Sequence, residues 1–561
     1  MCEKRGFRGL ECMFADMKNK KERSQNNKCI FALYKKKGKR KMNVRHLIIL
    51  CACAMCPSLT LLAQEKDGGA QRLAEGLVWR AEAQATVSDG QTPLWLNANK
   101  YGLSSLDDAN GYLLSGIFRP LATDSHRRWG VGYGLDVAVA TGFTSTLVVQ
   151  QAYAEVRWLQ GLLTVGSKEQ PMQLKNQRLS TGSQTLGINA RPVPSVRVEL
   201  PDYWNIPGLR GIVALKGHIA YGKRTDDAWQ KDFTHQQSHY TEGSLIHTKA
   251  GYLRVGNGKV NVELGVEAGC EFGGKAFNVS GVEPDGTVEN NQNLSAFFHA
   301  LVPGGSDVTD GNFKNSEGNH MGSYVARLNI DQPQWTLGLY ADHYFEDNSS
   351  MLHLSNNGWG KGEDADRKVD NRYFLYDMKD WMLGAEVRLK QCRWLNEVVV
   401  EYLYTKYQGG PVYHDHTPNV SEHLCGRDHF YNHYIFTGWQ HWGQVMGNPL
   451  YLSPIYNEDR LLQVENNRFT AWHLGLGGQP TDRLDYRILA TLQKSLGTYY
   501  YLVDDPKTEV SLLAEATYRF GSAKKTSQWY AKAAVGLDNG GLRGDNVGLQ
   551  LTLGRTGLFG K

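Results

Sequence analysis

The segment 409–466 gathers more side chains capable of chemistry than any other part of the chain. Its histidines are His414, His416, His423, His429, His433 and His441. The tripeptide His414-Asp415-His416 could offer nitrogen and oxygen ligands to a metal ion. No further ligand follows at the spacing of a zinc site, so we predict neither a bound metal nor a cofactor.

The same segment is rich in aromatic side chains, which favour a second chemistry. Aromatic faces stack on the apolar faces of sugar rings, and Asn, Asp, His and Arg side chains bond the hydroxyls. The carbohydrate-binding candidates of this segment are Tyr431, His433, Tyr434, Trp439, His441, Trp442 and Tyr451. In a structural alternative the segment folds into a lumen as a plug, and the rings form its small core. The two interpretations are compatible, and both stay open.

Asp342 and His343 are adjacent near the end of a predicted strand, within YADHYFED (340–347). A His–Asp pair at such a rim could activate water. Both residue types are common at strand ends, however, and no Gly-x-Ser-x-Gly or comparable nucleophile motif occurs in the chain. We predict that the protein is not an enzyme, and a hydrolase built on this pair is the least favoured alternative.

Segments of strict alternation must position these side chains. In LRVGNGKVNVELGVEAG (253–269), Val262 and Leu264 point one way, and Glu263 and Glu267 point the other. The Gly-Asn-Gly-Lys turn between the two runs predicts a tight hairpin. About eighteen such segments follow the N-terminal region, many of roughly ten to thirteen residues, close to the length that crosses a bilayer when tilted.

The connections between these segments alternate in length. Short ones are 159–162, 256–259, 331–334, 391–395 and 478–483, and long ones are 169–192, 223–243, 273–321, 346–378 and 409–466. Short turns at one end and long loops at the other are typical of outer-membrane barrels. The sequence therefore predicts an all-β fold, a transmembrane antiparallel β-barrel of about 18 strands with short periplasmic turns and long extracellular loops.

In such a barrel Val262 faces lipid and Glu263 faces a polar lumen. Backbone groups in lipid must all be hydrogen-bonded, which forces the sheet to close. Aromatic residues near strand ends are predicted to form the girdles at the two membrane interfaces. These are Tyr221, Tyr252, Trp335, Tyr402, Tyr404, Trp472 and Trp529.

Residues 1–63 form a predicted leader. The apolar run 47–63 follows a basic cluster and ends at small residues, as a secretory signal peptide does. Met42 stands at the usual starting distance, so we interpret 42–63 as the signal peptide and 1–41 as a mis-called extension. We predict that the remainder, 64–561, is a single outer-membrane β-barrel domain with loops that fold into the lumen.

The leader also carries the positive charge of the chain. Residues 1–63 hold 15 of the 62 Lys and Arg and 4 of the 57 Asp and Glu, which leaves 47 basic against 53 acidic residues, a net charge of −6. This balance gives no support for nucleic-acid binding. Only Cys270, Cys392 and Cys425 remain beyond the leader, without metal-ligand spacing. They fit a secreted protein that does not depend on disulfides.

Five motifs resemble the capsule assembly Wzi family of Gram-negative outer membranes. They are VGSKEQ (165–170), LSTGSQTLGINARPVPSVRVEL (179–200), HMGSYVARLNI (320–330), LYADHYFED (339–347) and FTGWQHWGQVMGNPLYLSP (436–454). The resemblance covers essentially the whole predicted mature chain and suggests a Bacteroidetes-type member. It implies an eighteen-stranded barrel that acts as a surface lectin for capsular polysaccharide. It also implies a small periplasmic helical bundle, for which 64–76 shows no three-helix pattern.

Three residues within the matching motifs are further candidates for polysaccharide binding: Lys168, Asn189 and Arg191. A structural alternative is that Arg191-Pro192 pins an inward-folded loop, as a buried Arg with a carboxylate partner would.

The residues and the resemblance together predict a protein of the cell outer membrane that binds capsular or extracellular polysaccharide and supports capsule assembly or attachment. The expected partners are that polysaccharide, outer-membrane lipid and the capsule export machinery, with no nucleic acid. The alternative function is a passive porin or sugar channel. The two differ in whether the segments 273–321 and 409–466 occlude the pore.

Overall fold

The computed structural model describes residues 73–282, 284–305, 317–346, 356–359, 368–371, 378–413, 424–521 and 527–559. The predicted leader 1–63 and the tripeptide His414-Asp415-His416 lie outside the described residues, as does His423. Only residues 73–77 of the described chain precede the first strand, and this stretch is too short to hold a helical bundle.

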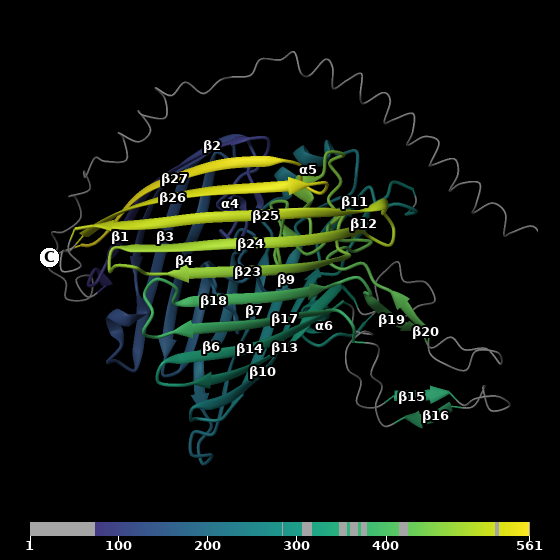
Figure 1. The fold of residues 1–561 in the computed structure, drawn as a ribbon. Helices are drawn as coiled ribbons and strands as arrows, with labels where there is room; N and C mark the ends of the chain where they lie inside the picture. Colours follow the sequence, from purple (N-terminus) through teal and green to yellow (C-terminus); the bar gives the residue numbers. More distant parts are fainter. Residues whose placement is uncertain are drawn as a thin grey trace, which may run out of the picture. The chain divides into compact units, whose positions relative to one another are not determined.

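Eighteen strands form one closed antiparallel sheet (Figure 1). Each strand pairs with its neighbours in chain order, and β1 (Val78–Asp89) pairs with both β2 (Ala109–Arg119) and β27 (Asn546–Leu558), which closes the barrel. The predicted fold class and strand number are confirmed. The other barrel strands are β3 (Trp129–Thr141), β4 (Leu147–Trp158), β5 (Gly161–Ser167), β6 (Ser195–Asn205), β7 (Val213–Lys223), β9 (Leu245–Val255), β10 (Val260–Phe272), β13 (Asn319–Asp331), β14 (Trp335–Glu346), β17 (Trp381–Leu389), β18 (Glu397–Tyr404), β23 (Phe469–Gly478), β24 (Leu484–Gly497), β25 (Leu502–Phe520) and β26 (Ser527–Gly540).

Short turns lie at one end of the barrel and long loops at the other, as predicted. The β9–β10 turn is 256–259, whereas the β18–β23 connection runs from 405 to 468. The long loops carry the remaining elements at the right-hand end of Figure 1. These are α5 (Asp227–Thr234), α6 (Leu294–Leu301), the sheet of β8 (Tyr240–Glu242), β11 (Lys275–Phe277) and β12 (Val288–Glu289), and the pairs β15 (Asn356–Trp359) with β16 (Lys368–Asn371), β19 (Gly409–Tyr413) with β20 (Leu424–Arg427), and β21 (Gln440–His441) with β22 (Gln444–Val445).

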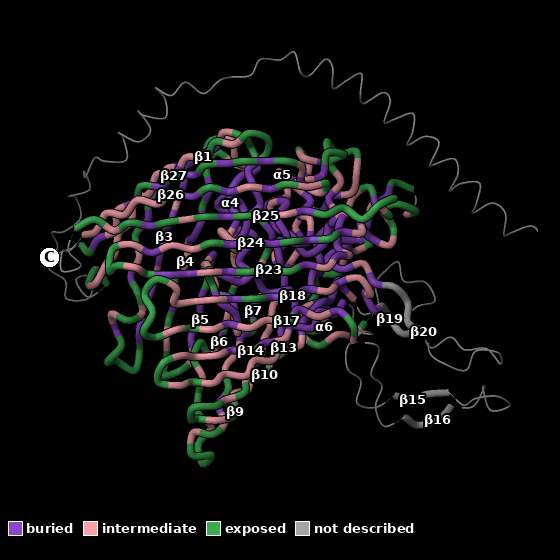
Figure 2. The backbone as a smooth tube through the Cα atoms, in the orientation of Figure 1, coloured by how far each residue is buried: buried purple, intermediate pink, exposed green. Residues whose placement is uncertain are grey.

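The alternation along β10 separates lipid-facing from luminal side chains as predicted. Val262 and Leu264 are exposed on the outside of the wall, whereas Glu267 is fully buried inside it. Figure 2 shows this alternation of exposed and buried positions along many barrel strands. One predicted girdle residue is wrong: Tyr252 points into the lumen, where its hydroxyl donates to Oε1 of Glu267 at 2.8 Å. Its neighbours in the sequence occupy the lipid face.

The main hydrophobic core lies inside the barrel. Leu94 and Leu96 of α4 (Leu94–Asn97), Tyr431 and Trp439 are fully buried together with wall residues such as Leu403. Such a core needs apolar side chains from the connections, because the luminal faces of the strands are mostly polar. The described residues also include two short 3₁₀ helices, Leu121–Asp124 and Pro454–Tyr456. Within the described residues, no helix has the length and apolar character needed to span a membrane.

Candidate functional site

Three connections fold into the lumen, and we call residues 91–106, 168–194 and 428–467 the plug. The first contains α4, whose Leu96 packs on Gly548 of β27, and Trp95 Nε1 donates to Thr491 Oγ1 at 3.1 Å. Glycine at 548 leaves room for this close approach. The plug fills the lumen from its middle to the end that carries the long loops.

Buried carboxylates on the luminal face of the strands hold the second plug segment. Lys175 Nζ lies 2.8 Å from Oδ2 of Asp342 on β14, and both side chains are almost completely buried. Burial alone would lower the pKa of Lys175, but the carboxylates of Asp342 and Glu267 raise it above its usual value. The lysine therefore stays charged and paired inside the barrel.

Glu401 on β18 makes the densest of these contacts. Its Oε2 accepts from the backbone N–H of Thr181 at 2.8 Å and from the Thr181 hydroxyl at 2.7 Å. Its Oε1 accepts from the hydroxyls of Ser180 and Tyr340, each at 2.5 Å. Charge-assisted bonds of this kind are stronger than neutral ones, so the motif 179–185 is fixed to the wall.

The third plug segment packs on the second. Trp439 Nε1 donates to the carbonyl oxygen of Thr185 at 2.8 Å, and the Tyr451 hydroxyl donates to Oε1 of Gln184 at 3.0 Å. The Trp439 ring lies on Gly269 of β10, where a Cβ atom would come within 2.4 Å of Cη2. The wall is thus shaped to receive this indole.

Four of the seven carbohydrate-binding candidates in 428–467 are enclosed by the plug. Tyr431, Trp439, His441 and Tyr451 are at most 1% exposed. The structural alternative, an aromatic core for a lumen plug, thus describes these four residues. Their contact with polysaccharide stays a prediction.

His441 shows how the plug fixes a neutral imidazole. Burial lowers its pKa to about 4. Its Nδ1 then carries the proton that bonds the carbonyl oxygen of Arg191 at 2.8 Å, and Nε2 accepts from the backbone N–H of Thr225 at 3.2 Å. No cluster of three or more His, Cys, Asp or Glu suited to a metal occurs within the described part of the chain.

Tyr434, Trp442 and His433 are the candidates of this segment that reach the surface. His433 is partly exposed, and its Nδ1 accepts from the backbone N–H of Ile435 at 3.0 Å. Tyr434 is half exposed, and its hydroxyl donates to the carbonyl oxygen of Ser280. Trp442 is partly exposed and lies 6.4 Å from Trp229 of α5, between ring centroids. A bound sugar can reach these three side chains without opening the plug.

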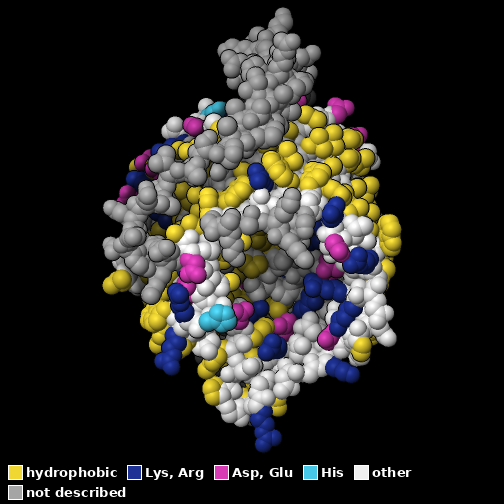
Figure 3. Space-filling model, turned by 90° about the vertical axis from the view of Figure 1, so that its left-hand side faces the viewer, with side chains coloured by type: hydrophobic (Ala, Val, Ile, Leu, Met, Phe, Trp, Pro, Cys, Tyr) yellow, Lys and Arg dark blue, Asp and Glu magenta, His cyan; other side chains and the backbone are white. Residues whose placement is uncertain are grey.

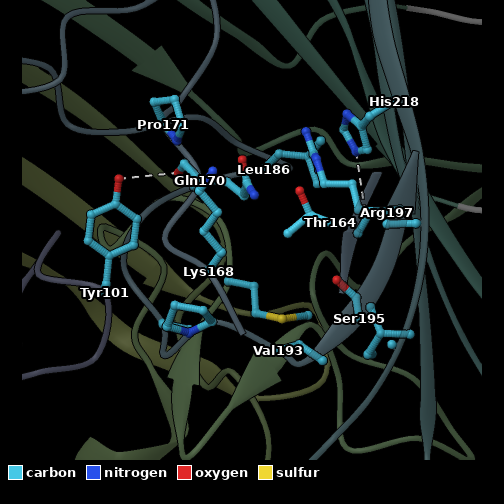
Figure 4. Close-up of a pocket in the computed structure, with 18 of the residues that line it drawn as sticks. Tyr101, Thr164, Lys168, Gln170, Pro171, Leu186, Val193, Ser195, Arg197 and His218 are labelled. Carbon is cyan, nitrogen blue, oxygen red and sulfur yellow. Dashed lines mark hydrogen bonds between the residues drawn. The ribbon is translucent and has the colours of Figure 1, made fainter. Parts of the chain in front are cut away.

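Lys168 and Arg191 line the same cavity, between the plug and the β5–β9 wall. The cavity holds about 160 Å³, and Figure 4 shows Lys168, Thr164, Arg197 and His218 around it. Lys168 also pairs with Glu155 and lies over the Tyr153 ring at 5.0 Å. Two of the three binding candidates taken from the matching motifs, Lys168 and Arg191, thus lie at one cavity.

The third motif residue, Asn189, is buried away from this cavity's lining and acts within the plug. Its Oδ1 accepts from the Asn99 N–H at 3.1 Å, and its Nδ2 donates to the Val445 carbonyl oxygen at 3.0 Å. It thereby joins all three plug segments.

Arg191 is buried without the carboxylate partner that the structural alternative required. Its guanidinium lies 4.2 Å from the centre of the Trp442 ring and bonds Thr144 Oγ1 at 3.4 Å. Burial lowers its pKa to about 10, an effect that Asp226 opposes. A cation–π contact therefore replaces the expected ion pair.

Asp342 and His343 do not form a catalytic pair. Adjacent strand residues face opposite sides of a sheet. Asp342 points into the lumen and bonds Lys175. His343 points outward, where Nδ1 donates to the Asp380 carbonyl oxygen at 2.6 Å and the ring centre lies 4.8 Å from that of Trp381. The hydrolase alternative is therefore not supported, because its two side chains lie on opposite faces of the wall.

A groove opens at the long-loop end, where α5, the β8–β11–β12 sheet and the end of β7 meet. Its volume is about 590 Å³, and its lining is Lys223, Asp227, Glu242, Gly243, Gly274, Lys275, Glu289, Asn290 and Gln292. These side chains offer both donors and acceptors to hydroxyls and charged groups. These residues are not predictable from the sequence, because isolated polar residues in a long loop carry no spacing signal.

The lumen stays hollow at the end that carries the short turns. Charged side chains of β1 and β24–β27 line a space of about 560 Å³, including the Arg487–Glu515 pair at 2.9 Å. Figure 3 views this end and shows basic and acidic side chains around the hollow, with apolar side chains on the outer rim. Water therefore reaches the plug from the periplasmic side.

The comparisons with known proteins show the fold. No protein-family model matches the chain. No curated protein matches it in sequence either. Among solved structures it is similar to Wzi of Escherichia coli, an outer-membrane protein described as a carbohydrate-binding β-barrel involved in group 1 capsule assembly. The TM-score is 0.51 at 14% identity, and the match covers 86% of each chain. It also aligns with OprD of Pseudomonas aeruginosa at a TM-score of 0.41 and 9% identity, over 87% of this chain and 96% of that one.

Proposed function

We propose that the protein is an outer-membrane surface lectin that binds capsular or extracellular polysaccharide at its long-loop end. The binding supports assembly or attachment of the capsule, with the export machinery as the source of the polymer. The observation that carries the proposal is the filled lumen. Barrels of this size leave an aqueous channel when nothing occupies them. Here the plug is bonded to the wall at Asp342 and Glu401, so the barrel serves as a platform for its loops.

The groove supplies the chemistry for sugar binding. Ligand sites commonly occupy about 300–1,000 Å³, and the groove falls within this range at about 590 Å³. Lys223 and Lys275 can donate to hydroxyls or to the carboxylates of acidic sugars, while Asn290 and Gln292 can both donate and accept. Tyr434 and Trp442 provide partly exposed rings at the same end of the barrel.

Two observations support the proposed class of ligand: the resemblance to the Wzi family, and the carbohydrate-binding Wzi barrel of the same fold. Both support a polysaccharide rather than a protein or nucleic-acid ligand. Membership of that family, including a Bacteroidetes-type branch, remains part of the proposal.

Binding of purified capsular polysaccharide to the protein in lipid nanodiscs tests the proposal. The variant Lys223→Ala/Lys275→Ala should bind more weakly. It should still fold, because the Lys275–Glu289 pair is exposed, and exposed pairs contribute little to stability. The matched control is Lys390→Ala, which removes an exposed pair with Asp331 at the short-turn end. Equal binding by the double variant and the control would contradict the groove assignment.

The sugar-channel alternative makes a different prediction. A passive porin gives stable open conductance in planar bilayers, whereas a plugged barrel does not. The purified wild-type protein should therefore show no steady open current. Steady current together with absent polysaccharide binding would favour the channel.

A further inference from the structure

Helix α6 lies on the outside of the barrel wall. Its Ala296 and Ala300 pack on Cys270 and Phe272 of β10. Cys270 and Phe272 share the strand face of Val262, which is exposed to the outside. The β10–β13 connection therefore passes over the rim and returns along the outer surface.

Three hydrogen bonds from wall side chains hold α6 in this position, and a fourth caps its N-terminus. The Tyr221 hydroxyl on β7 donates to the carbonyl oxygen of Phe297 at 2.8 Å. Lys249 on β9 donates to the carbonyl oxygen of Ala300 at 3.0 Å and also to that of Leu301. A cation at a helix C-terminus complements the helix dipole. At the other end, Asn293 Oδ1 accepts from the Ala296 N–H at 3.0 Å. The helix is thus a docked element of the wall.

The other face of α6 is apolar and uncovered. Leu294 is 89% exposed, Phe298 is 59% exposed, and Val302, which follows the helix, is 50% exposed. In water such a cluster would be unfavourable, and it marks a contact with another apolar phase.

The height of α6 on the wall fits the outer leaflet. Ten residues of β10 separate Val260, near the periplasmic turn, from Cys270 under the helix. At about 3.3 Å per residue and a tilt of about 40°, they rise about 25 Å along the membrane normal. The apolar band of such barrels is about 25 Å tall, so α6 lies at its outer edge.

Other strands support this placement. At their extracellular ends Val139, Leu147 and Val547 are exposed on the outer wall, with no helix over them. The apolar band therefore extends to this height on the part of the wall from β27 to β4. Under α6 the wall is covered, and Leu294 and Phe298 continue the band in its place.

We propose that α6 is an interfacial helix that inserts Leu294, Phe298 and Val302 into the hydrocarbon edge of the outer leaflet. Helices of this kind bury their apolar face about 5–10 Å below the headgroups. The groove residues Glu289, Asn290 and Gln292 directly precede α6 in the chain. The insertion holds this side of the groove beside the membrane surface.

Nitroxide labels on single cysteines test the insertion in dimyristoyl phosphatidylcholine vesicles. The background carries Cys392→Ser and Cys425→Ser and keeps the fully buried Cys270. The test positions are Phe298→Cys and Val302→Cys. Leu264→Cys on the lipid-facing wall and Gln292→Cys in the groove are the lipid and water references. Heat-modifiable gel mobility selects folded protein.

The proposal expects Phe298 and Val302 to match Leu264, with frequent collisions with oxygen and loss of collisions with a water-soluble nickel chelate. Nickel collisions equal to those at Gln292 would place α6 in water and overturn the proposal. Protection from both reagents with spin–spin broadening would mean that a second copy of the chain covers this face, which also overturns it. Because two positions one helical turn apart are used, failure of one variant to fold leaves the test intact.

Discussion

Lys175 of the plug and Asp342 of the wall form an ion pair at 2.8 Å, although 167 positions separate them in the sequence. Asp342 also accepts from the backbone N–H of Gln184 at 3.2 Å. Asp342 therefore fastens both ends of residues 175–184 to strand β14.

Lys175→Met should destabilise the plug by about 3–5 kcal/mol, because it leaves a buried carboxylate without its partner. Urea unfolding in detergent micelles, followed by tryptophan fluorescence, measures the change. The double variant Lys175→Met/Asp342→Leu should recover much of the loss, since no unpaired charge remains. A double variant as unstable as the sum of the two single variants would show that the ion pair is not the cause.

Gly269→Ala should also loosen the plug. The added Cβ atom would come within 2.4 Å of the Trp439 ring, which is rigid and fully buried. Overpacking of this kind typically costs about 1–3 kcal/mol. Limited proteolysis within 428–467 measures the loosening. The control is Gly251→Ala on the neighbouring strand β9, where no atom lies within 4 Å of the new Cβ, and its cleavage rate should equal that of the wild type.

The two faces of β10 make opposite predictions for the same substitution. Val262→Arg places a charge on the lipid face, two residues above the start of β10 at the periplasmic turn. Such a charge costs roughly 2–4 kcal/mol at the bilayer midplane and about 0–1 kcal/mol near the interfaces, so this variant should fold less completely than the wild type. Glu263→Arg faces the polar lumen, where Glu263 bonds Asn329 at 3.0 Å, and should fold nearly normally. Heat-modifiable mobility after folding into vesicles separates the two. Folding of Val262→Arg with failure of Glu263→Arg would invert the assignment of the faces.

Acidification should weaken the plug through His441. The ordinary pKa of histidine is about 6.5, and burial lowers that of His441 to about 4. As the pH falls below 6.5 the unfolded chain takes up the proton first, so stability declines between pH 6.5 and 4, by roughly 3 kcal/mol for this residue. His441→Gln should flatten the decline over this window in unfolding experiments. If the free energy of unfolding of His441→Gln fell with pH as steeply as that of the wild type, protonation of His441 would not be the cause.

The barrel was predictable because each strand carries its own signal. A side-chain period of two and a lipid-facing apolar row are local properties of the sequence, as in 260–266. Tyr252 shows the limit of this signal. An aromatic ring near a strand end suits a membrane girdle, but here it bonds the luminal Glu267. The sequence pattern does not show what fills the lumen.

The plug and the groove were harder to predict, for two reasons. A segment rich in rings has the same composition whether it forms a binding surface or a small core, so Trp439 and Tyr451 supported both interpretations. The contacts of the plug also join distant positions, such as Thr181 with Glu401. Such pairs leave no spacing pattern. Lys168 and Arg191 line one cavity because both residues flank one inward-folded loop, and their contact with polysaccharide stays a prediction.

Release of capsule from cells tests the proposed function most directly. A strain lacking the gene is complemented with the wild type, with Lys223→Ala/Lys275→Ala, or with the control Lys390→Ala, and cell-bound and released polysaccharide are measured. We predict that the deletion and the groove variant move polysaccharide from the cells into the medium while its total amount stays constant, and that the control restores attachment. Unchanged cell-bound polysaccharide in the deletion strain would contradict the account.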